Sequence, residues 1–65
     1  PGIAEIEYRL SGLYFMLNNA EFGYKHLENG LKADSEYYII IEELFPEIFK
    51  RKSVKQLIDS YQKAS

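Results

Sequence analysis

A chain of 65 residues without cysteine is long enough for one small domain, and it has neither disulfides nor thiolate metal ligands to stabilise it. Its hydrophobic fraction of 46% argues against intrinsic disorder, and its net charge of −2 provides no overall attraction to nucleic acid. No apolar run approaches the roughly 20 residues of a membrane-spanning helix, and no segment resembles a signal peptide. We therefore expect a cytoplasmic protein that binds neither membranes nor nucleic acid. Because the chain begins with Pro1 rather than methionine, we expect a fragment or a processed chain.

The first half of the chain predicts two amphipathic helices. Over residues 3–17 the apolar side chains recur at helical spacing and form one stripe: Ile3, Ile6, Leu10, Leu13, Tyr14 and Leu17. Asn18 and Asn19 then favour a turn or a helix N-cap. Over residues 20–33 a second stripe consists of Ala20, Gly23, Tyr24, Leu27, Gly30 and Leu31. We expect both stripes to face the core.

The second half predicts a less regular helical pair. Residues 37–41 are five large apolar or aromatic residues in a row, a pattern that also suits a buried strand. A strand would divide the isoleucines between two faces, whereas a helix gathers one stripe of Tyr37, Ile40, Ile41, Leu44, Phe45 and Ile48; the helix is favoured. Pro46 either begins a new helical turn or kinks this helix.

A last helix is predicted at the end of the chain. The run Ser53-Val54-Lys55-Gln56 has the spacing of a capping box, which marks a helix start. The apolar side of this helix consists of Val54, Leu57, Ile58 and Tyr61.

The first two helices resemble a tetratricopeptide repeat, a helix-turn-helix unit of about 34 residues. Leu10 and Tyr14 match the leucine and tyrosine of the family pattern, while Ser11 stands where glycine is usual. Glu7 departs from the aromatic residue that the family has there. In the second helix Gly23, Leu27 and Gly30 supply the family's small, bulky and small residues. A glycine inside a helix costs about 1 kcal/mol relative to alanine, so this pair of glycines indicates close packing against a neighbour.

The resemblance implies an all-α fold of antiparallel helical hairpins, of the alpha-alpha superhelix type, with four to five helices. Residues 1–65 then form a single domain, with the repeat-like pair at 3–35 and an irregular pair at 36–63. The second pair resembles the C-terminal cap that closes a repeat array. The resemblance also implies a non-catalytic protein–protein interaction scaffold, in which the first helix of each pair lines a groove for a partner's peptide or helix.

The candidate partner-binding residues lie on the expected groove side of the first and third helices. They include residue types that are enriched at interfaces: Tyr8, Arg9, Gly12, Phe15, Met16, Tyr38 and Ile39. Packing within a repeat array competes with partner binding as the role of these residues. The alternative function is a structural self-association or capping domain, a homodimer without a peptide ligand.

Catalytic, metal and cofactor sites are not expected. His26 is the sole histidine, and because it lies off the second stripe we expect it to be solvated. The sequence has no Ser-His-Asp set, zinc-ligand spacing or glycine-rich phosphate loop. A basic cluster of Lys50, Arg51, Lys52 and Lys55 is interpreted as a solvated loop, with lipid or nucleic acid as the alternative ligand. It can also pair weakly with Glu42, Glu43 or Glu47.

Overall fold

The computed structural model describes residues 2–62, and within them it contains α-helices and one short 3-10 helix but no strand. In chain order these are α1 (Ile3–Met16), α2 (Ala20–Ala33), η1 (Ser35–Tyr38), α3 (Ile39–Leu44), α4 (Pro46–Phe49) and α5 (Lys52–Gln62). The predicted all-α fold is confirmed. Residues 1 and 63–65, which the predicted domain also includes, lie outside the described residues.

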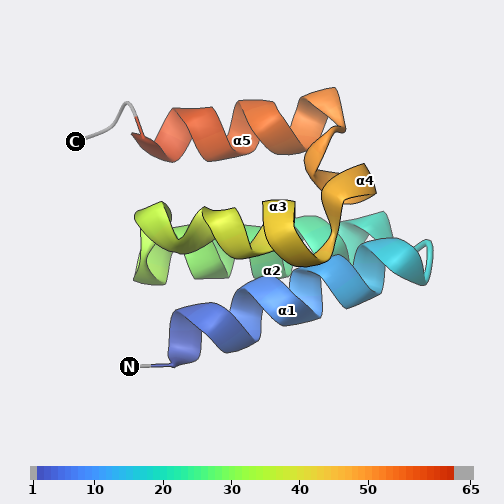
Figure 1. Cartoon of the computed structure of the whole chain (residues 1–65). Helices are drawn as coiled ribbons and strands as arrows, with labels where there is room; N and C mark the ends of the chain where they lie inside the picture. The colour runs from blue at the N-terminus through green and yellow to red at the C-terminus, as the bar shows by residue number, and fades with distance from the viewer. Residues whose placement is uncertain (1, 63–65) are drawn as a thin grey trace.

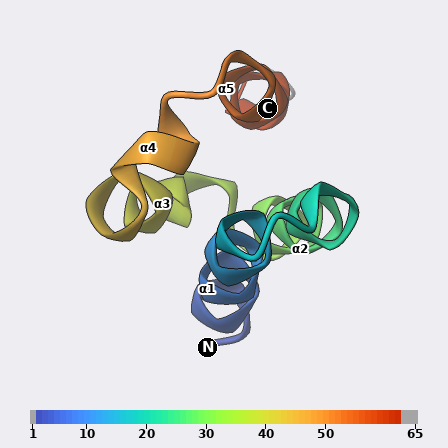
Figure 2. The same cartoon turned by 90° about the vertical axis from the view of Figure 1, so that its right-hand side faces the viewer.

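The helices are arranged around the hairpin of α1 and α2 (Figure 1). Figure 2 shows α1 at one edge of the molecule and α5 at the opposite edge, with α2 and α3 on either side between them. As a result, α1 is covered from one side by the rest of the chain.

The turn of the hairpin follows the prediction for the two asparagines. Asn18 adopts a left-handed backbone conformation with φ of 63°, which asparagine tolerates better than most residues. The side chain of Asn19 accepts a hydrogen bond of 3.2 Å from the backbone N–H of Phe22 and so caps α2. This turn reverses the chain and places α2 against α1.

Small residues let the two helices approach closely, as the sequence predicted. Gly23 lies against the ring of Phe15, and Gly30 lies against the ring of Tyr8. Ser11 is fully buried between the helices, and its hydroxyl donates a hydrogen bond of 2.7 Å to the carbonyl oxygen of Gly23. The hairpin is therefore built from aromatic rings of α1 that fill the space over the glycines of α2.

The face of α1 that enters the core is the opposite of the predicted one. Its buried residues are Tyr8, Ser11, Gly12 and Phe15, whereas most of the predicted stripe is exposed. The physical reason is shape: rings and small side chains match the glycine face of α2, which branched aliphatic side chains cannot do. The phenol of Tyr8 also donates a hydrogen bond of 2.7 Å to the carbonyl oxygen of Asp34, which satisfies its polar atom within the core.

The second half of the chain folds as a series of short helices. The favoured helical reading of 37–41 is confirmed, although the first two of these residues belong to the 3-10 helix. Pro46 occupies the first turn of α4, so it begins a new helix. The predicted stripe contributes Ile40, Ile41 and Ile48 to the buried core, but Tyr37 and Leu44 are exposed because the segment is not one continuous helix.

Helix α5 closes the domain over α2. Val54 and Ile58 are buried, with Leu57 and Tyr61 packed beside them, as predicted. The helix begins at Lys52, so Ser53 lies inside the first turn rather than at the predicted start. The hydroxyl of Ser53 instead forms a hydrogen bond with that of Tyr24, and the phenol of Tyr61 donates one of 3.1 Å to Glu28.

Candidate interaction surface

Three of the candidate partner-binding residues are inside the protein. Tyr8 and Phe15 are 0% and 2% exposed, and Gly12 is covered by the ring of Phe45. The sequence placed them on an open groove side because it assigned the other face of α1 to the core. A partner therefore has no access to these three residues.

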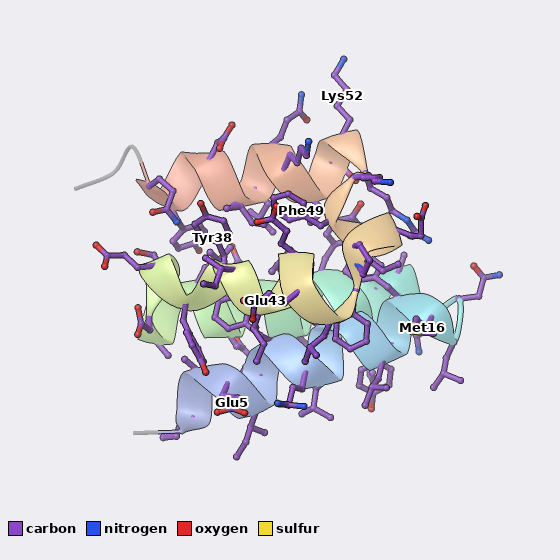
Figure 3. The ribbon with its side chains drawn as sticks, viewed as in Figure 1. Glu5, Met16, Tyr38, Glu43, Phe49 and Lys52 are labelled. Atoms are coloured by element: carbon purple, nitrogen blue, oxygen red, sulfur yellow. The ribbon has the colours of Figure 1, made fainter. Side chains whose placement is uncertain are left out.

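The remaining candidates do not form one continuous site. Met16 and Ile39 are exposed on α1 and α3, and Arg9 forms an ion pair of 2.9 Å with Glu5 on the surface of α1. Tyr38 is half-buried, and its ring lies nearly parallel to that of Phe49, with 6.4 Å between the centroids (Figure 3). These residues belong to separate surfaces of the molecule.

Two shallow hollows adjoin candidate residues, one beside Met16 and the other beside Tyr38. One, of about 170 Å³, is mainly apolar and is lined by Met16, Leu44, Phe45, Pro46, Glu47 and Ile48. The other, of about 230 Å³, is lined by Tyr38, Phe49, Lys55, Ile58 and Asp59. Both are smaller than the roughly 300–1,000 Å³ of a typical small-molecule site.

An apolar surface is formed by the part of the predicted core stripe that the fold leaves outside. We call Ile3, Ile6, Leu10, Leu13 and Leu17 the α1 stripe. Ile3, Ile6, Leu13 and Leu17 are 66%, 58%, 52% and 75% exposed, and Leu10 is half-buried. A single exposed isoleucine or leucine is ordinary, but a row of them along one helix face makes the α1 stripe a candidate interaction surface.

The spacing of the α1 stripe is that of a coiled-coil seam. Its members follow one another at intervals of three and four residues, as the a and d positions of two heptads do. With about 30 Å² per aliphatic carbon, the four most exposed members and the neighbouring Met16 present roughly 400 Å² of apolar surface. A standard interface uses about 800 Å² per partner, of which a little more than half is apolar. The surface therefore has nearly the apolar area of a specific interface.

A polar and aromatic cluster borders the stripe on the side of α2. The Nδ1 atom of His26 lies 2.8 Å from Oε1 of Glu7, and the side-chain N–H of Asn29 donates to the same oxygen at 3.0 Å. The hydrogen bond with His26, helped by that from Asn29, holds the pKa of the Glu7 carboxyl below its usual value, against a smaller opposing effect of burial. The ring of His26 is stacked on that of Tyr14, with 5.3 Å between their centroids. His26 is thus a half-buried structural residue, and the expectation that it is solvated is wrong.

The basic cluster takes part in the fold. The guanidinium of Arg51 lies 5.4 Å from the centroid of the Phe15 ring, and the ammonium of Lys55 lies 5.3 Å from that of Phe49. Lys50 pairs with Glu47 at 3.5 Å, one of the three glutamates that the sequence offered as partners. The Arg51 contact links the turn before α5 to α1, while the four basic residues remain exposed to solvent, as the interpretation of a solvated loop predicts.

Two further features of the described helices bear on function. Among residues 2–62 there is no cluster of histidine and carboxylate side chains that could hold a metal ion. None of the helices in this part of the chain has the length and apolar character to span a membrane.

No family model, curated protein or solved structure matches this chain. The resemblance to tetratricopeptide repeats therefore stays a prediction.

Proposed function

We propose that the protein is a non-catalytic protein–protein interaction module that docks an α-helix of its partner on the α1 stripe. The observation that carries the proposal is that α1 has two apolar faces on opposite sides, one buried and one exposed. The site differs from the groove predicted on the first and third helices, because Tyr8, Gly12 and Phe15 belong to the buried face.

The heptad spacing supports a helix as the docked element. Side chains at a and d positions insert between those of a facing helix at a crossing angle of about 20°, which keeps the seam covered along its length. An extended peptide has its side chains in a period of two and does not match intervals of three and four.

The energetics are consistent with weak, reversible binding. Fully burying one isoleucine or leucine contributes about 1.5–3 kcal/mol, so covering the four most exposed stripe residues contributes on the order of 5 kcal/mol. The partner's own apolar residues add a similar amount. Against the roughly 4–15 kcal/mol that association costs, this sum of about 10 kcal/mol leaves at most about 6 kcal/mol, which corresponds to a Kd of tens of micromolar or weaker.

The buried residues also support the tetratricopeptide type of module. The spacing of the family's first aromatic residue, its glycine and its second aromatic residue is that of Tyr8, Gly12 and Phe15, while Ser11 stands where the family has leucine. This register is one residue later than the one that the sequence favoured. Gly23 and Leu27 follow with the family's spacing in the second helix.

A labelled designed peptide with leucine at its a and d positions tests the proposal. We expect fluorescence anisotropy to show binding to the full chain and a loss of about tenfold or more in affinity with Leu13→Glu, since a charge would be buried in the seam. Ile39→Glu is the matched control, because Ile39 is similarly exposed but lies on α3. Equal binding by both variants and the natural chain would mean that the α1 stripe is not the docking surface.

A further inference from the structure

The helix that occupies the α1 stripe has a definable chemistry. It must offer aliphatic side chains at intervals of three and four residues, and its flanks must suit those of α1. Arg9 lies on one flank of the stripe, and Glu7 lies on the other. Both are held in place, Arg9 by Glu5 and Glu7 by His26 and Asn29.

We propose that the occupant is a second copy of this chain, with α1 of one copy packed in parallel against α1 of the other. The proposal rests on the proposed function, since it names the partner of the same surface. The stripe is complementary to itself, because it is a seam of isoleucine and leucine without a polar residue.

The charges of the flanks favour the parallel orientation. In a parallel helix pair each flank meets the opposite flank of the partner, and a g position lies beside the e position five residues later. Arg9 of one copy therefore comes beside Tyr14 of the other, and Glu7 meets no charged residue. In an antiparallel pair like flanks meet, and the register that overlaps the first halves of the two helices brings Arg9 near Arg9 and Glu7 near Glu7. The parallel arrangement thus keeps like charges apart.

The area and the rigidity of the surface suit a dimer. The roughly 400 Å² of apolar surface on each copy approaches what one side of a standard interface uses. Helix α1 is already folded and held by the hairpin, so pairing does not have to order it; an isolated helix of 14 residues would be marginal in water.

A lipid surface fits the same stripe less well. Helices that lie on membranes carry lysine and arginine beside their apolar face. The flanks of the α1 stripe carry Glu5 and Glu7 with a single cation, Arg9. Binding to anionic vesicles by the natural chain, abolished by Leu13→Glu, would overturn the dimer as the use of this surface.

Sedimentation of the full chain from about 1 μM to about 1 mM tests the proposal. We expect the average mass to rise from 7.6 kDa towards twice that value. Leu13→Glu is expected to raise the dimer Kd about 100-fold or more, and Ile39→Glu to leave it within about threefold, with circular dichroism showing that both variants are folded. Self-association that survives Leu13→Glu would place the contact elsewhere and overturn the proposal.

Single cysteines test the orientation, because the natural chain has none. Ile3→Cys and Leu17→Cys lie at opposite ends of the stripe. In a parallel dimer each variant forms a disulfide with another copy of itself under mild oxidation. Disulfides that form only in a mixture of the two variants would show an antiparallel pair and overturn the orientation proposed.

The designed heptad peptide separates the failure of this inference from that of the proposed function. A chain that stays monomeric at about 1 mM but binds the peptide through the α1 stripe overturns the second copy and leaves a different helix as the occupant. A chain that neither self-associates nor binds the peptide overturns both.

Discussion

Gly23→Ala tests the close approach of α1 and α2, on which the exposed stripe depends. A methyl group at this position would lie 2.8 Å from atoms of the Phe15 ring, whereas ordinary contacts begin at about 3.4 Å. The ring has little freedom to move, since Phe15 is buried, meets Tyr24 edge to face, and is covered by Arg51. The substitution therefore forces either the ring or the helix to shift.

Two effects of opposite sign decide the result. Replacing glycine by alanine inside a helix stabilises by about 1 kcal/mol, while overpacking a core costs about 1–3 kcal/mol. With an overlap of about half an ångström against a confined ring, we expect the packing cost to win by about 1 kcal/mol. In a domain of this size that lowers Tm by about 4–8 °C.

Gly30→Ala is the comparison within the same helix. Its methyl group would lie 3.1 Å from the Tyr8 ring, a contact that a small shift relieves, so we expect a stability change within about 0.5 kcal/mol of zero. Urea denaturation followed by circular dichroism measures both variants. A Gly23→Ala protein more stable than the natural one would refute the close packing of the hairpin.

Three more changes test individual contacts. Tyr8→Phe removes the hydrogen bond to the Asp34 carbonyl and should lower the free energy of unfolding by about 1 kcal/mol in the same urea assay; no loss would show that the bond contributes nothing. The lowered pKa of Glu7 means that its contribution to stability is present above the unfolded pKa of about 4.5 and is lost as pH falls through the folded value. Glu7→Gln should therefore flatten the decline of Tm in acid, and an unchanged decline would contradict this account. Ile39→Glu should change stability by less than about 1 kcal/mol, and a larger loss would show that Ile39 supports the core.

Several elements of the fold were predictable from local patterns. The apolar spacing of α2 and α5 and the asparagine turn with its cap are confirmed because each depends on residues close in the chain. Of the two alternatives left open for Pro46, the structure has the new helix. The glycines of α2 also indicated close packing correctly, since a helix rarely keeps two glycines on one face without a neighbour that needs the space.

The candidate site was predicted less well. Arg9, Met16 and Ile39 are exposed as expected, but Tyr8, Gly12 and Phe15 are buried. The regular aliphatic spacing of the α1 stripe is visible in the sequence. The sequence pattern predicted that these residues face the core, whereas the structure leaves them outside.

Local sequence pattern is enough to make α1 a helix with aliphatic residues along one side and aromatic and small residues along the other. Which of these two sides faces the core depends on packing against α2 and the later helices. Hydrophobic periodicity shows which side chains gain free energy by leaving water. Both faces of α1 carry such side chains, so the periodicity does not distinguish between them. Burial also requires complementary shape, and the rings of Tyr8 and Phe15 fit the glycines of α2 where the isoleucines and leucines do not. The more aliphatic face consequently remains outside, available to another helix.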